Sequence, residues 1–115
     1  MDATVPNVIA ATIAEVEAER AASGKLYRQF MSCGTLSAGL YRLAAGGEDP
    51  QQPHAEDEVY YIVSGRARLM AGDEDIAVEP GSTIFVAREV PHRFHDIEED
   101  LSVLVFFAPE HTPQD

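Results

Sequence analysis

The chain has 115 residues, of which 45% are hydrophobic and 24% are charged, values typical of one globular domain rather than of a disordered chain. Its 20 acidic and 8 basic residues give a formal net charge of −12. The few Lys and Arg residues are scattered, which argues against nucleic acid and anionic lipid as partners because both would be repelled.

The N-terminus carries neither the charged block nor the apolar block of a signal peptide. No apolar run approaches the roughly 20 residues needed to cross a bilayer. We therefore expect a soluble, cytoplasmic protein with no membrane partner.

The first expected element is an amphipathic helix over residues 7–22. Asn7 is its candidate N-cap, and Ser23–Gly24 ends it because glycine tolerates the positive φ of a helix C-cap. Apolar or β-branched residues recur at helical spacing: Val8, Ile9, Thr12, Ile13 and Val16. We expect this helix to cover a sheet face or a dimer partner and to carry no chemistry.

After Gly24 the chain changes character, because short β-branched and aromatic segments alternate with glycine, proline and aspartate. Strands are expected at residues 26–31, 35–43, 59–63, 67–71, 75–79, 83–86, 93–97 and 101–108. Turn signals stand at Gly46–Gly47, Ser64–Gly65, Gly72–Asp73, Pro80–Gly81 and Glu99–Asp100. Many short strands at this spacing predict an all-β sandwich or barrel.

Cys33 is the only cysteine, which excludes an internal disulfide and a zinc cluster of thiolates. We expect it to be a buried or half-buried strand residue. The alternative is a reactive thiol, but no neighbouring cation would activate it. On a later pair of strands, Arg66 and Arg68 are expected to form one exposed face opposite Asp75 or Glu79.

Two of the four histidines, His54 and His92, stand in two blocks of candidate functional residues, residues 46–58 and residues 80–95. Gln52 and His54 are two residues apart, so on an extended chain they point to the same face. On a straight strand Glu58 would lie about 13 Å from His54. That is too far to share an ion whose ligands lie about 2 Å from it. The chain must bend between His54 and Glu58 if both bind, and spacing alone leaves this open.

The two blocks resemble the paired motifs of the cupin superfamily. The first motif runs Gly, five residues, His, one residue, His, three or four residues, Glu, six residues, Gly. At these intervals the chain has Gly46, Gln52, His54, Glu58 and Gly65. The second motif is a Pro–Gly turn, a strand and a lone His, which here are Pro80–Gly81 and His92. The resemblance covers roughly residues 35–108.

The resemblance implies a small single-domain cupin of the conserved-barrel cupin 2 type. Its double-stranded β-helix, or jelly-roll barrel, would occupy residues 25–109. An N-terminal helical extension at residues 1–24 would precede it, and a flexible tail at residues 110–115 would follow.

The resemblance also implies one divalent metal ion (Fe, Mn, Zn or Ni) held by His54, Glu58 and His92. The family's usual residue at position 52 is histidine, and Gln52 could complete the metal ligands or hydrogen-bond a substrate. Two imidazoles and one carboxylate are the ligand set typical of non-haem Fe(II). With a divalent ion such a site has a charge near +1, which favours an anionic or enolisable ligand.

Tyr60 shares its strand face with Glu58 and is expected to point into the barrel. Its hydroxyl could act as an acid or hold a substrate, so Glu58 and Tyr60 are the candidate catalytic residues, although packing is the other role open to a buried tyrosine. Ile62 and Phe94 are also expected to face inward.

Four other polar residues are expected to lie outside the metal site. His95 alternates with His92 and should face outward. His111, in the tail, is expected to play no part, and Glu56 and Asp57 are expected to form a solvated corner.

Three functions follow from these features. The first is a metal-dependent enzyme on a small organic acid, ketone or phenolic compound, acting as a dioxygenase, isomerase or lyase. The second is a non-catalytic module that binds a small molecule, and the third is a structural barrel with a degenerate site. The ligand set favours the enzyme, and we expect a homodimer.

Overall fold

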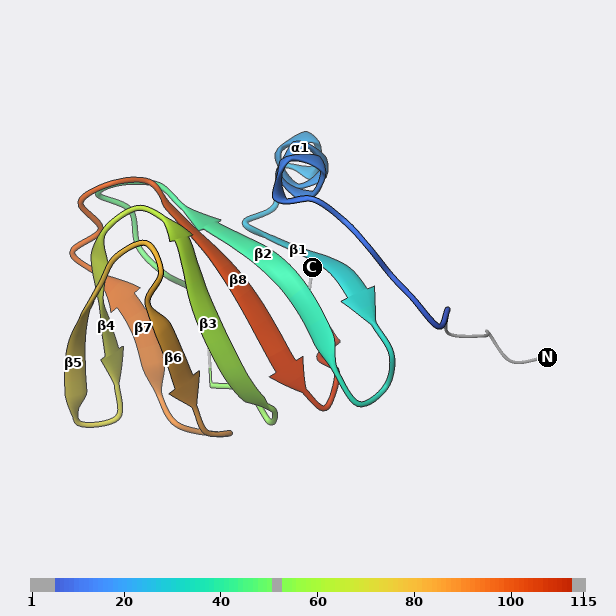
Figure 1. Cartoon of the computed structure of the whole chain (residues 1–115). Helices are drawn as coiled ribbons and strands as arrows, with labels where there is room; N and C mark the ends of the chain where they lie inside the picture. Colours follow the sequence, from blue (N-terminus) through green and yellow to red (C-terminus); the bar gives the residue numbers. More distant parts are fainter. Residues whose placement is uncertain (1–5, 51–52, 113–115) are drawn as a thin grey trace.

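The structure of the chain is a computed structural model that describes residues 6–50 and 53–112. These residues form one helix and eight strands, arranged as Figure 1 shows. Their bounds are α1 (Ile13–Ser23), β1 (Tyr27–Ser32), β2 (Ser37–Leu43), β3 (Asp57–Ser64), β4 (Ala67–Ala71), β5 (Glu74–Val78), β6 (Thr83–Val86), β7 (His92–His95) and β8 (Leu101–Ala108).

The strands form two antiparallel sheets. One has the order β1-β2-β8-β3-β6 and the other has the order β5-β4-β7. The last strand, β8, therefore lies in the middle of the larger sheet, paired with β2 on one side and β3 on the other. This arrangement confirms the predicted jelly-roll barrel with one N-terminal helix.

Alternation of side chains along the strands builds the core. In β3 the residues Glu58, Tyr60 and Ile62 are buried while Val59 and Tyr61 are exposed, as expected for a strand with one face toward the core. Phe94 in β7 is buried as well. The inward positions predicted for Tyr60, Ile62 and Phe94 are thus confirmed.

The helix begins later than the sequence pattern predicted. Thr12, not Asn7, is the N-cap, because Thr12 and Glu15 form a capping box in which each side chain bonds the backbone N–H of the other. Val8 is 82% exposed, so the apolar spacing before Thr12 has no surface to pack against. The predicted start at residue 7 is wrong.

The helix packs against β1 and β2, above which it lies in Figure 1. Val16 is its buried residue. Beside it the Glu17 carboxylate lies 3.6 Å from the guanidinium of Arg42 in β2. Within residues 6–50 and 53–112, no helix combines the length and apolar character that a bilayer crossing requires.

Cys33 is exposed and lies in the turn between β1 and β2, so its predicted place in a buried strand is wrong. Its backbone N–H donates to the Leu36 carbonyl, which closes the turn, and the following Gly34 has a φ of 89°. A residue with positive φ fits a turn and not a strand, so β1 ends at Ser32.

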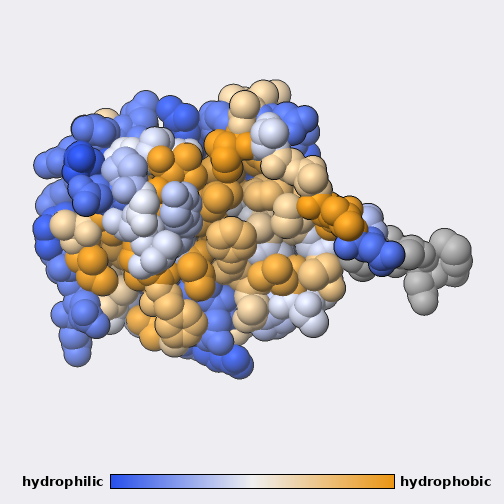
Figure 2. Space-filling view, in the orientation of Figure 1, coloured by the Kyte–Doolittle hydropathy of each residue, from blue (hydrophilic) through white to orange (hydrophobic). Residues whose placement is uncertain are grey.

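Two exposed ion pairs link β4 to the β5 region. Arg66 Nη1 lies 2.8 Å from Glu79 Oε1, and Arg68 Nε lies 3.2 Å from Asp75 Oδ1. The face predicted for these residues is confirmed. Elsewhere Figure 2 shows hydrophobic surface across the middle of the molecular face seen in Figure 1, with hydrophilic surface around it.

Candidate metal centre

The chain bends at Ala55–Glu56, immediately before β3 begins at Asp57. This bend answers the question that spacing left open. It brings one ligand atom each of His54, Glu58 and His92 within 4.8 Å of one another, whereas a straight strand would separate the first two by about 13 Å.

Each of the three side chains is positioned by a different part of the fold. Glu58 is the second residue of β3, where it pairs with Val86 on β6 and Phe107 on β8. His92 begins β7. His54 lies in the segment before β3, and its carbonyl accepts a 2.7 Å hydrogen bond from the Glu89 N–H.

The Glu58 and His92 side chains are 1% and 2% exposed, and His92 Nε2 lies 2.6 Å from Glu58 Oε1. His92 Nδ1 lies 2.7 Å from the Val90 carbonyl and donates to it. That bond selects the tautomer whose Nε2 carries a lone pair, the usual arrangement of a metal-binding histidine.

The buried ligand atoms of His92 and Glu58 lack hydrogen-bond partners within the described part of the chain. His92 Nε2 and Glu58 Oε2 have no hydrogen-bond partner there, and the short approach of Nε2 to Oε1 lacks the direction of a hydrogen bond. A buried carboxylate costs free energy unless a cation or donors compensate it. The three residues therefore fit a divalent cation, which would accept all of these lone pairs.

The titration of the two imidazoles is set by opposing effects. Burial lowers the pKa of His54; the charge of Glu58 opposes this effect, and the charges of His111 and His92 add to it. Burial also disfavours the charged form of His92, but the adjacent Glu58 carboxylate and the hydrogen bond to the Val90 carbonyl outweigh it and raise the pKa of His92. In the absence of a metal, a proton is thus drawn to the His92–Glu58 pair.

Two other predicted site residues stand apart from this group. Gln52 lies outside the described residues. Tyr60 is fully buried, with its ring centroid 5.9 Å from that of His92 and 5.1 Å from that of Phe94. These contacts are those of a packed core residue, and its part in proton transfer stays a prediction.

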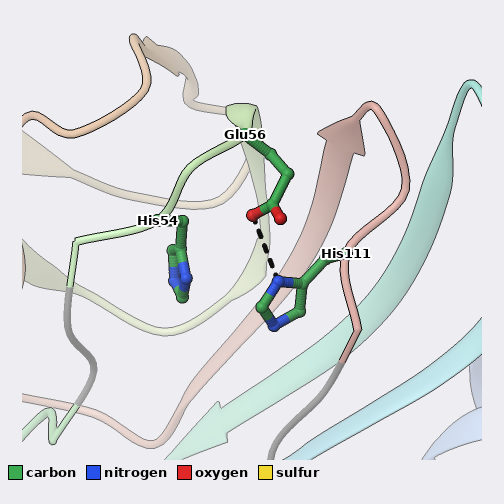
Figure 3. A group of neighbouring side chains, drawn as sticks. All are labelled: His54, Glu56 and His111. Atoms are coloured by element: carbon green, nitrogen blue, oxygen red, sulfur yellow. Dashed lines mark hydrogen bonds and ion pairs between the residues drawn. The ribbon is translucent and has the colours of Figure 1, made fainter.

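His111 and Glu56 form a second group with His54 that the sequence did not reveal (Figure 3). His111 Nδ1 lies 3.1 Å from Glu56 Oε1, and the two side chains are only 15% and 16% exposed. The expectation of a solvated Glu56 is therefore wrong, and His111, which was expected to play no part, lies beside it. Asp57 does lie at the surface, where Oδ1 accepts from the Arg88 N–H.

The strand register explains why His111 lies here. Ala108 at the end of β8 pairs with Asp57 at the start of β3. In an antiparallel pair, residues that follow one strand lie beside residues that precede the other. Once this register is known, His111 must be near Glu56 and His54, but no motif in the sequence gives the register.

His95 behaves as expected. It faces outward from β7, where its Nε2 lies 2.8 Å from Asp75 Oδ1, and it belongs to neither group of candidate ligands.

A groove of about 1120 Å³ opens beside these residues. His54, Glu56 and His111 line it, together with Tyr27 and Phe107. Glu58 and His92 do not, so His54 is the member of the buried group that reaches the groove.

Tyr27 is a further residue of the site that sequence reasoning missed. Its hydroxyl is buried and has no hydrogen-bond partner among the described residues. Burial raises the pKa of Tyr27, and the charges of Glu58 and Glu56 add to this effect, so the phenol stays protonated. Gly39 makes room for the ring, because a Cβ at that position would collide with it.

Comparisons with known proteins identify the family and the fold. A family model described as Cupin domain (Cupin_2) matches residues 39–107. An uncharacterized protein of Streptomyces coelicolor is 53% identical over 95 residues, which are 83% of this chain and 90% of that protein.

Solved structures share the fold. The DMSP lyase DddQ from Ruegeria pomeroyi superposes with a TM-score of 0.70 at 20% identity, over 76% of this chain and 48% of the lyase chain. KdgF from Halomonas sp. gives a TM-score of 0.67 at 20% identity, over 74% of this chain and 80% of that one. The chain thus spans about half the length of the lyase.

Proposed function

Because the chain belongs to the Cupin_2 family of cupin domains, we propose that it is a metal-dependent enzyme acting on a small anionic or enolisable molecule. His54, Glu58 and His92 hold one divalent cation, here called the inner position. The observation that carries this proposal is that two buried potential ligand atoms, Glu58 Oε2 and His92 Nε2, have no hydrogen-bond partner among the described residues.

The chain's own residues supply the surroundings for such chemistry. A divalent cation at the inner position would polarise a bound oxygen as a Lewis acid. Two neutral imidazoles and one carboxylate leave a net charge near +1 with that cation, which attracts an anionic group. The groove beside His54 receives the substrate, and the unpartnered hydroxyl of Tyr27 donates a hydrogen bond to it.

The metal content of the purified protein tests the inner position. We expect about one equivalent of Fe, Mn, Zn or Ni in wild type and a strong loss in Glu58→Ala and His92→Ala. His95→Ala is the matched control, because His95 also pairs with a carboxylate but lies in neither ligand group. Equal metal content in wild type and both ligand variants would refute the proposal.

Assays of the loaded protein distinguish the reaction classes. Oxygen consumption with diketones, phenols or thiols indicates a dioxygenase, and turnover without oxygen uptake indicates an isomerase or lyase. The DMSP lyase is similar in fold, and 20% identity does not carry its substrate to this chain.

The groove also supports a second function, a non-catalytic module that holds a small molecule near the cation. Binding of an anionic ligand with no chemical change over many hours would favour this module over the enzyme. The degenerate, filled barrel is less well supported, because the groove leaves space beside His54.

The homodimer predicted from the sequence remains a proposal. Exposed apolar residues on the paired strands β3 and β6, namely Val59, Tyr61 and Phe85, offer a surface for it. Sedimentation velocity at micromolar concentration tests it, and a monomer there would contradict it.

A further inference from the structure

Glu56, His111 and His54 form a cluster that the proposed inner position does not use. One ligand atom of each lies within 4.8 Å of the others. Imidazole nitrogens and a carboxylate oxygen are the ligands that Zn²⁺ and related ions take in proteins. Both ends of the cluster are partly shielded from water, since Glu56 and His111 are 16% and 15% exposed.

The cluster is held in place by contacts that do not involve its ligand atoms. The His111 ring packs on Phe107 with centroids 4.5 Å apart, and the His54 ring meets the same phenylalanine at 5.1 Å. The His111 backbone N–H donates to Ser37 Oγ at 2.9 Å. The neighbouring residue Glu110 accepts from the Gly34 N–H and donates to the Gly34 carbonyl, which ties this segment to the β1–β2 turn.

His54 belongs to both groups. Its ring centroid lies 5.9 Å from that of His92 and 4.9 Å from that of His111, so it stands between them. A neutral imidazole has one nitrogen with a free lone pair, and so it binds one ion at a time. Two cation positions that both depend on His54 must exclude each other.

We propose that Glu56 and His111, together with His54, form a second, outer position for a divalent cation, and that it competes with the inner position for His54. The outer position opens to the groove, whereas Glu58 and His92 are buried. A cation arriving from solvent therefore meets the outer position first. The competition rests on the proposed inner position, whereas the proposal of an outer position rests only on Glu56, His111 and His54.

The simpler reading of the cluster is a structural ion pair between Glu56 and His111 that fastens the C-terminal segment. His95 and Asp75 form such a pair, 2.8 Å apart, and within residues 6–50 and 53–112 they belong to neither group of candidate ligands. They provide a matched control that separates a cation site from a mere ion pair.

Zn²⁺ titration followed by calorimetry and by imidazole nitrogen NMR tests the proposal. The variants are Glu58→Gln/His92→Gln for the inner position, Glu56→Gln/His111→Gln for the outer position and His95→Gln as control. Glutamine is preferred to alanine because it keeps most of the side-chain volume. Circular dichroism confirms that each variant is folded before titration.

We expect wild type to bind one Zn²⁺ per chain. The inner variant still binds one, at least 10-fold more weakly, with shifts confined to the nitrogens of His54 and His111. The outer variant also binds one, with shifts at His54 and His92, while His54→Gln binds at least 100-fold more weakly than wild type. The control variant binds like wild type.

Two results would overturn the proposal. If the inner variant binds no Zn²⁺ while the outer variant matches wild type, the outer position does not exist and the inner position stands. If wild type binds two ions per chain, the positions do not compete. Unchanged affinity and unchanged His54 and His111 shifts in the inner variant would instead refute the inner position and leave the outer ligand set intact.

Discussion

Glu58→Gln should reduce the stabilisation that a cation gives this protein, because only the weaker outer position keeps all of its ligands. The substitution keeps the shape of a side chain that is 1% exposed but removes its charge and one ligand. A ligand present at 100 times its Kd stabilises a folded chain by about 2.7 kcal/mol. At roughly 2.1 cal/mol/K per residue, 115 residues give about 0.24 kcal/mol/K, so wild type should melt about 11 °C higher with metal.

The opposite order is expected when the metal is removed. An unsatisfied buried polar group costs about 1–3 kcal/mol, and a charged one costs more. In EDTA, at a pH high enough to keep His92 neutral, the variant should therefore melt at or above the temperature of wild type.

Scanning calorimetry of both proteins, in EDTA and with Zn²⁺, measures the two effects. Glu79→Gln is the control, because Glu79 is an exposed carboxylate that pairs with Arg66 and belongs to neither ligand group. An equal Zn²⁺ shift in wild type and Glu58→Gln would refute the inner position. A variant that melts well below wild type in EDTA would show that the carboxylate has a structural partner.

Three further predictions concern stability. Thr12→Ala removes the helix N-cap and should lower the free energy of unfolding by about 1 kcal/mol in urea titration. No change would mean that the cap does not contribute to stability. Asp49→Ala removes the acceptor of two buried hydrogen bonds, from the Tyr41 hydroxyl at 2.5 Å and from the Phe94 N–H at 2.9 Å, and should cost at least about 1–3 kcal/mol; a smaller loss would contradict these bonds. The hydrogen bond from His95 lowers the pKa of Asp75, so its contribution is present above about pH 4 and is lost as pH falls through the lowered value. The melting-temperature difference between wild type and Asp75→Asn should shrink below that pH, and a difference that grows would refute this.

The strands could be predicted closely because their signals are local. Alternation and turn residues place β4 at 67–71, β6 at 83–86 and β8 at 101–108, as the structure has them. The predicted helix start was wrong because the spacing of apolar residues does not show whether they are buried. Val8 and Ile9 have the right period but no sheet beneath them, whereas the Thr12–Glu15 capping box fixes the true start.

The candidate site could be predicted only as far as the motifs reach. His54, Glu58 and His92 follow from paired motifs, and the structure brings them together. His111 and Tyr27 depend on strand register and on the neighbours of β1, which are long-range properties. Tyr27 pairs with Tyr41 across β1 and β2, and its ring has room because Gly39, two residues before Tyr41 on β2, has no side chain.

The central place of β8 also has a consequence for biosynthesis. This strand joins β2 to β3, two strands that do not pair with each other. Until residue 108 has left the ribosome, both strands present open edges along which other chains could add. Nascent or truncated chains should therefore depend on chaperones, and stop codons before β8 should yield insoluble protein rather than a smaller folded domain.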